Sequence, residues 1–137
     1  MPVRFYSQDI NFSLKGRQAI SKLLLAAIRK EKKKAGEINY IFCNDAFLLA
    51  LNKKFLKHNT LTDIITFQYP GKELSAEIYI SIQRVKENTK KFGAPFVNEL
   101  QRVMIHGVLH LCGYTDKSWK KKKEMRARED HYLKLLK

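Results

Sequence analysis

The chain has 137 residues, of which 45% are hydrophobic, so we expect one globular domain spanning residues 1–137. Glycine (6) and proline (3) are too sparse for a collagen-like or disordered chain, and no apolar run is long enough to span a membrane. Lysine and arginine exceed aspartate and glutamate by 27 to 13, and this net charge of +14 favours a polyanionic partner such as a nucleic acid. The first residues, MPVRFYSQDINF, lack the apolar stretch of a signal peptide, so we expect a cytoplasmic protein without a membrane partner.

Apolar periodicity and turn residues predict the element order β-α-β-α-β-β-α-α-α. The predicted strands cover residues 2–6, 36–44, 63–69 and 76–82, and the predicted helices cover residues 13–34, 45–57, 83–93, 95–112 and 118–137. Ser13 is expected to cap the first helix, Gly93 to end the third and Pro95 to begin the fourth. Together these elements predict an α+β fold, a small mixed four-stranded sheet with helices packed on it.

The stretch HGVLHLCGYTD, residues 106–116, has the spacing of a metal site. His106 and His110 are four residues apart and share one helix face, so both imidazoles can reach one ion. Gly113 allows the chain to turn back, and Asp116 then offers a carboxylate to the same point. Two imidazoles and one carboxylate leave one position open on tetrahedral zinc, which is the arrangement of a catalytic site. Iron, nickel and manganese also accept this donor set, and the competing interpretation is a core histidine next to a helix C-cap.

The same spacing occurs in the metal-binding motif of the metzincin proteases. Those proteases need a glutamate directly after the first histidine as their general base. Gly107 stands at that place and cannot take a proton, which argues against a metallopeptidase. The positive charge points instead to a phosphodiester substrate.

Basic residues gather in four clusters along the chain, and together they favour nucleic acid over a merely solvated lysine-rich surface. From these clusters we expect five residues to contact RNA: Lys54, Lys57, Arg84, Lys86 and Lys117.

The motif at 106–116 resembles the signature H-G-x-L-H-L-x-G-Y-D-H of the YbeY family of bacterial endoribonucleases and rRNA maturation factors. The segments LNKKFLKHNTLTDIITF (51–67) and AEIYIS (76–81) resemble further blocks of that family. The resemblance implies a metal-dependent, single-strand-specific endoribonuclease that matures the 3′ end of 16S rRNA and serves ribosome quality control. It also implies an α+β fold with a zincin-like metal helix, one zinc ion at His106, His110 and the third motif position, and the small ribosomal subunit as a partner.

Two departures from the family pattern bear on the chemistry. Asp116 stands where the family usually has its third histidine, and this anion should make the zinc a weaker Lewis acid. Leu56 stands where the family usually has an arginine that is suspected of holding a substrate phosphate. The catalytic residues therefore stay open, with Asp63, His58 and Arg102 as the candidates. Asp63 can equally be a turn residue.

A second function is compatible with the same features. The chain can be a ribosome assembly factor that binds RNA through its basic clusters, with a structural metal and little or no catalytic activity. Both functions predict RNA binding that weakens steeply with salt, so only a cleavage assay separates them.

Overall fold

The structure, a computed structural model, describes residues 3–136. A four-stranded sheet lies at its centre, with strand order β1-β2-β4-β3. Strands β1 (Val3–Ser7), β2 (Ala35–Cys43) and β4 (Leu74–Ser81) run parallel, and β3 (Ile64–Tyr69) pairs antiparallel with β4 at the edge. The predicted α+β fold with a mixed four-stranded sheet is therefore confirmed.

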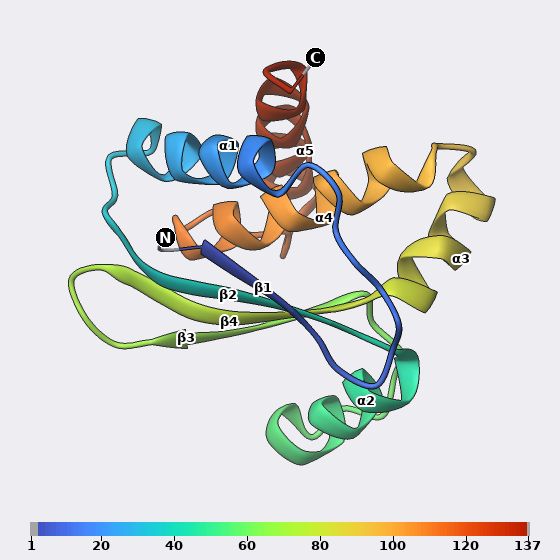
Figure 1. Cartoon of the computed structure of the whole chain (residues 1–137). Coiled ribbons are helices and arrows are strands. Elements are labelled where there is room, and N and C mark those ends of the chain that lie inside the picture. The colour runs from blue at the N-terminus through green and yellow to red at the C-terminus, as the bar shows by residue number, and fades with distance from the viewer. Residues whose placement is uncertain (1–2, 137) are drawn as a thin grey trace.

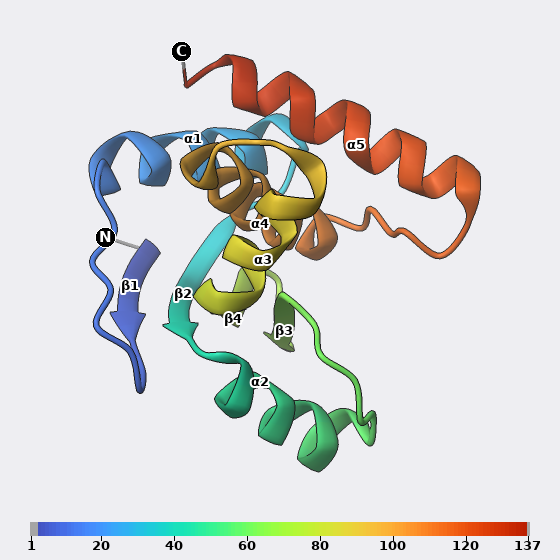
Figure 2. The same cartoon turned by 90° about the vertical axis from the view of Figure 1, so that its right-hand side faces the viewer.

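The helices are unequally divided between the two faces of the sheet, as Figure 1 shows. On one face lie α1 (Arg17–Lys30), α3 (Ile82–Phe92) and α4 (Phe96–Leu111), and α5 (Trp119–Lys134) packs on α4. On the other side lies α2 (Asp45–Leu51), which continues into a short π-helix η1 (Asn52–Leu56). Figure 2 shows α5 running along the outer side of α4, so that α4 lies between the sheet and α5.

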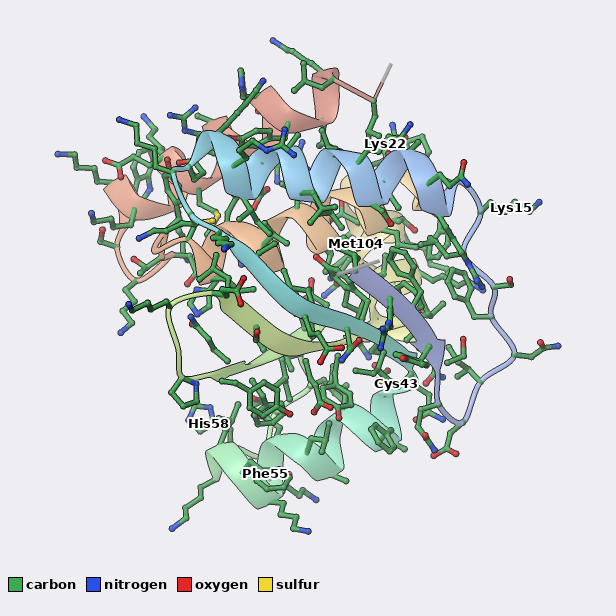
Figure 3. All side chains as sticks on the ribbon, turned by 60° about the vertical axis from the view of Figure 1, so that its left-hand side comes forward. Lys15, Lys22, Cys43, Phe55, His58 and Met104 are labelled. Carbon is green, nitrogen blue, oxygen red and sulfur yellow. The ribbon has the colours of Figure 1, made fainter. Side chains whose placement is uncertain are left out.

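Alternation along the strands creates the core between the sheet and α4. Ile38, Tyr40 and Phe42 on β2 are all buried, and they point to the same face because successive strand residues alternate sides. The hydroxyl of Tyr40 donates to the carbonyl of Met104 at 2.7 Å, which satisfies a buried phenol and ties α4 to the sheet. Figure 3 labels Met104 in this layer beneath α1.

Several element boundaries differ from the prediction. The first helix begins at Arg17, so the prediction that Ser13 caps it is wrong. Gly16 caps it in the left-handed conformation (φ 70°), which separates residues 13–15 from the helix, and the Ser13 hydroxyl instead accepts a hydrogen bond from Arg17. The predicted helix 45–57 becomes α2 and η1, and ends where Lys57 adopts φ 56°.

The remaining helix ends agree with their predicted signals. Gly93 ends α3 with φ 70°, and Pro95 directly precedes the first residue of α4. Pro2 and Lys137, which belong to the predicted first strand and last helix, lie outside the described residues. Within residues 3–136, no helix is both long and apolar enough to cross a membrane.

Candidate active site

Helix α4 carries the histidine pair, and its middle lies directly against the sheet. Gly107 is buried there, and a Cβ atom at this position would lie 3.1 Å from Ile64 Cδ1 and 3.3 Å from Ile78 Cδ1. The missing side chain therefore allows α4 to pack closely on β3 and β4. A glutamate at 107 would point into this packing, so the place of the peptidase base is filled by the sheet.

The imidazole of His106 is hydrogen-bonded to a buried carboxylate. Its Nδ1 lies 2.7 Å from Glu129 Oε2, and Glu129, on α5, is only 4% exposed. The other carboxylate oxygen of Glu129 accepts from Arg102 Nη1 at 2.9 Å, and Arg102 also binds Asp130. Burial lowers the pKa of His106, but the hydrogen bond and charge of Glu129, together with the charges of Asp116 and Asp63, outweigh burial and raise the pKa overall. A carboxylate on Nδ1 orients the ring and leaves Nε2 as the ligating atom.

The turn after α4 brings Asp116 back to His106. Gly113 has φ 108°, a conformation that favours glycine, and the amide of Tyr114 donates to the Leu109 carbonyl at 3.1 Å. Asp116 Oδ2 then lies 3.9 Å from His106 Nε2. Two ligands of one tetrahedral zinc are roughly 3.3 Å apart, given bonds of about 2.0–2.1 Å. A small movement of the exposed Asp116 side chain is thus enough for both atoms to share an ion.

Glu31, just after α1, anchors this turn from outside. The hydroxyls of Tyr114 (2.8 Å) and Tyr132 (2.5 Å) both donate to its carboxylate, and Arg128 lies 3.8 Å away. Burial raises the pKa of Glu31, but the two tyrosine hydrogen bonds and the charge of Arg128 outweigh it and lower the pKa overall. The turn that carries Asp116 is therefore tied to two helices.

A cavity of about 670 Å³ lies between β3, α4 and α5, and His106, His110, Asp116 and Glu129 line it. Its lining includes four acids and three bases: Asp63, Glu99, Asp116, Glu129, Arg102, Lys122 and Arg126. Burial raises the pKa of Asp63, while the neighbouring His106 charge lowers it by less. With neutral histidines the lining carries 4 acids against 3 bases, whereas the chain carries 13 against 27. The lining of the cavity is thus much less basic than the chain as a whole.

The donor set fits a divalent metal, although its side chains lie further apart than ligands of a bound ion. Among residues 3–136, no three His, Cys, Asp or Glu side chains lie close enough to hold a metal ion without moving. His110 lines the same cavity one helical turn after His106, and both it and Asp116 are exposed. His106 Nε2, His110 and Asp116 are the residues that can hold the ion, with the Glu129 contact as the supporting observation.

The other predicted residues fall into two groups. Asp63 and Arg102 line the cavity, but Arg102 already binds Glu129 and Asp130. His58, by contrast, is an exposed residue just after η1 and does not line the cavity. Figure 3 shows it near Phe55, on the side of the sheet where α2 lies.

The residues predicted to contact RNA are spread over the surface, and for each of them that contact stays a prediction. Lys54 and Lys57 are exposed on and beside η1, and Lys117 is exposed between α4 and α5. Lys86 lies over the ring of Phe96, 5.6 Å from its centroid. Arg84 is only 22% exposed and binds Asp45 at 2.8 Å.

Sequence reasoning missed Glu129, Lys122 and Arg126 as residues of the site. One signal was available for Glu129, which lies four residues after Met125 and three before Tyr132. All three residues are buried, so Glu129 lies on the apolar face of α5. A carboxylate on such a face needs a hydrogen-bonding or charged partner. Leu56 lines the cavity as well.

Known proteins resemble this chain over nearly its whole length. A family model described as Endoribonuclease YbeY matches residues 3–137. The Endoribonuclease YbeY of Flavobacterium psychrophilum is 49% identical over 132 residues, covering 96% of this chain and 94% of the relative. That of Cytophaga hutchinsonii is 45% identical over 136 residues, covering 97% and 94%. The solution structure of TM1509 from Thermotoga maritima matches with a TM-score of 0.69 and 28% identity, covering 98% of this chain and 88% of that one.

Proposed function

The chain belongs to the YbeY endoribonuclease family, and on that basis we propose that it is a metal-dependent endoribonuclease whose ion is held by His106, His110 and Asp116. The family assignment confirms the resemblance that the motif at 106–116 suggested. The observation that carries the metal proposal is the buried Glu129 carboxylate on Nδ1 of His106, with Asp116 facing Nε2 of the same ring. In metal sites, the ring nitrogen of a histidine that does not bind the ion ordinarily donates to a carboxylate, a backbone carbonyl or water.

When bound, a zinc ion or another divalent transition metal would supply Lewis acidity toward the phosphate and make water more acidic. The zincin-like role of α4 in this proposal is to offer two imidazoles from one face. Arg102 and Glu129 keep the first imidazole in one orientation, so little freedom is lost when the site forms. Asp63 is the candidate for moving a proton, because it lines the cavity while His58 does not.

Substrate phosphates need cations that are not already paired with carboxylates. Lys122 and Arg126 line the cavity from α5, and we assign them the phosphates next to the scissile bond. They would compensate for Leu56, which cannot hold a phosphate. The exposed residues Lys54, Lys57 and Lys117 would contact RNA further away, with smaller individual contributions.

The proposed substrate is single-stranded RNA, in the first place 16S rRNA or its precursor on the small ribosomal subunit in the cytoplasm. This choice follows the family and the net charge of +14. One domain would carry the whole activity, since the cavity takes residues from Leu56 to Glu129. The alternative, an RNA-binding assembly factor with a structural metal, keeps the same binding surface and differs only in the absence of cleavage.

The test measures metal content and RNA cleavage in the wild type and in His110→Ala. We expect the wild type to hold one equivalent of metal and to cleave single-stranded RNA, and to lose cleavage when a chelator is added. His110→Ala should lose both metal and cleavage while retaining RNA binding. Full metal content and cleavage in the variant would contradict the site, and chelator-resistant cleavage would point to a contaminating nuclease.

A further inference from the structure

Trp119, the first residue of α5, is the most exposed of the large apolar side chains among the described residues, at 71%. The backbone around Trp119 is fixed by a helix cap. Ser118 caps α5 by accepting the amide of Lys121 at 3.1 Å, so the helix start that carries Trp119 is ordered by its own hydrogen bonds. A single exposed apolar side chain is common on protein surfaces, so the meaning of this one depends on its neighbours.

Helix geometry aligns Trp119 with the cationic wall of the cavity. Residues three, four and seven apart share one helix face, so Trp119 lies in line with Lys122, Lys123 and Arg126. Lys122 and Arg126 line the cavity with His106 and Asp116. Because a helix rises 1.5 Å per residue, Trp119 lies roughly 4.5 Å along the axis from Lys122, just outside the cavity.

The surroundings of the indole are strongly basic. Lys123 Nζ lies 4.2 Å from the ring centroid, over one of its faces. Lys117, Lys120 and Lys122 are all exposed within three residues of it. An aromatic ring set among cations is the combination with which proteins bind single-stranded nucleic acid, since bases stack on the ring while phosphates meet the cations.

We propose that Trp119 is a stacking platform for one unpaired base of the RNA, next to the phosphodiester that lies in the cavity. Lys122 and Arg126 hold the phosphates between that base and the metal ligands. The unpaired base sets the preference for single strands, because a base inside a duplex already stacks on its neighbours. This inference rests on the proposed function and adds a substrate contact that the YbeY signature does not contain.

The chain reports on this contact directly, because Trp119 is its only tryptophan. The experiment titrates metal-free protein, which cannot cleave, with a 10-nucleotide oligoadenylate RNA and follows tryptophan fluorescence. We expect saturable quenching, with weaker quenching by an RNA duplex of the same length. Unchanged fluorescence during binding that is detected independently by anisotropy would overturn the proposal.

Substitution separates stacking from charge. Trp119→Leu should weaken oligoadenylate binding by about 5-fold or more and leave the salt dependence of binding unchanged, since no phosphate contact is lost. Trp119→Phe should recover part of the affinity. The matched control is Tyr6→Leu, which removes a 48% exposed aromatic on β1, at the opposite edge of the sheet from β3, and should bind as the wild type does. Equal losses in Trp119→Leu and Tyr6→Leu would contradict a specific platform.

Two further measurements keep this inference distinct from the proposed function. If metal-loaded wild type cleaves RNA and Trp119→Leu binds and cleaves equally well, the platform is wrong and the nuclease stands. If quenching and the affinity loss occur but no metal restores cleavage, the nuclease is wrong and the platform stands. A blue shift with vesicles of anionic phosphatidylglycerol, without quenching by RNA, would assign Trp119 to a lipid surface and overturn the proposal.

Discussion

The floor and the rim of the cavity are built differently. At the floor, His106, Glu129 and Arg102 form a continuous hydrogen-bonded chain whose side chains are mostly buried. At the rim, His110 and Asp116 are exposed, and the Asp116 oxygen lies 3.9 Å from the His106 nitrogen that it faces. The floor is therefore held in place by its own hydrogen bonds, whereas we expect the rim to change its geometry if the proposed metal and RNA bind.

Removing the carboxylate at the floor should have the largest effect. Glu129→Gln keeps the shape of the side chain but loses the charge that orients His106. We expect metal affinity and RNA cleavage to fall by about 10–100-fold, the range found for partners of ligand histidines. Metal titration and cleavage rates measure this. The control is Glu124→Gln on the exposed side of α5, and equal metal affinity in the wild type and Glu129→Gln would show that the floor does not matter.

Changing the charge of the rim should shift the pH dependence of cleavage. Asp116→His replaces an anionic donor by a neutral one, which raises the net charge of the metal site and its acidity toward water. The rising limb of the pH–rate profile should move to lower pH by up to about 2 units, the span that ligands produce at zinc. A profile that stays in place, with the metal still bound, would mean that Asp116 is not a ligand.

Restoring a cation to the cavity wall tests the role of Leu56. Leu56→Arg introduces a guanidinium into the cavity lining that also holds Lys122 and Arg126. We expect RNA affinity or cleavage to rise by about 3–10-fold, as one solvent-exposed hydrogen bond with a net value of about 0.5–1.5 kcal/mol allows. Kinetics at several RNA concentrations measure the gain. The control is Leu61→Arg, because Leu61 is also an exposed leucine but does not line the cavity. An equal gain in Leu61→Arg would mean that the gain comes from the added net charge alone.

Glu31, which holds the turn that carries Asp116, should affect the stability of the fold more than the rate of cleavage. Glu31→Gln weakens the hydrogen bonds from Tyr114 and Tyr132 and should lower the free energy of unfolding by about 1 kcal/mol at pH 7. The pKa of Glu31 is lowered in the folded state, so its contribution is present above the unfolded pKa and disappears as the pH falls through the folded value. Denaturant unfolding measured at pH 7 and at successively more acidic pH should thus show a difference between the wild type and Glu31→Gln that shrinks as the pH falls, and a difference that is the same at every pH would contradict this account.

The parts of the site that the sequence predicted are those encoded by local spacing. The shared face of His106 and His110 follows from helical periodicity, and the turn at Gly113 follows from its conformational freedom. Glu129, Lys122 and Arg126 could not be placed, because their positions depend on how α5 packs back on α4, which local patterns do not encode. Arg84 shows the reverse case, since a residue that looked like part of a basic cluster pairs with Asp45, 39 residues earlier.

The same distinction applies to the fold. Alternation and turn residues predicted every strand, because those signals are local. The start of α1 was misplaced because Ser13 has the chemistry of a cap, while the backbone at Gly16 decides where the helix begins. The position of Leu56 in the cavity lining also needed the structure, since it depends on how η1 lies relative to elements far away in the sequence.

Diffraction from crystals grown with zinc, recorded on both sides of the zinc absorption edge, tests the proposed metal site most directly. We predict one strong anomalous peak in the cavity, about 2.0–2.2 Å from His106 Nε2, from a ring nitrogen of His110 and from a carboxylate oxygen of Asp116, with Glu129 still on Nδ1 of His106. A peak bound by other residues, or none in the cavity of a protein that cleaves RNA, would contradict that site.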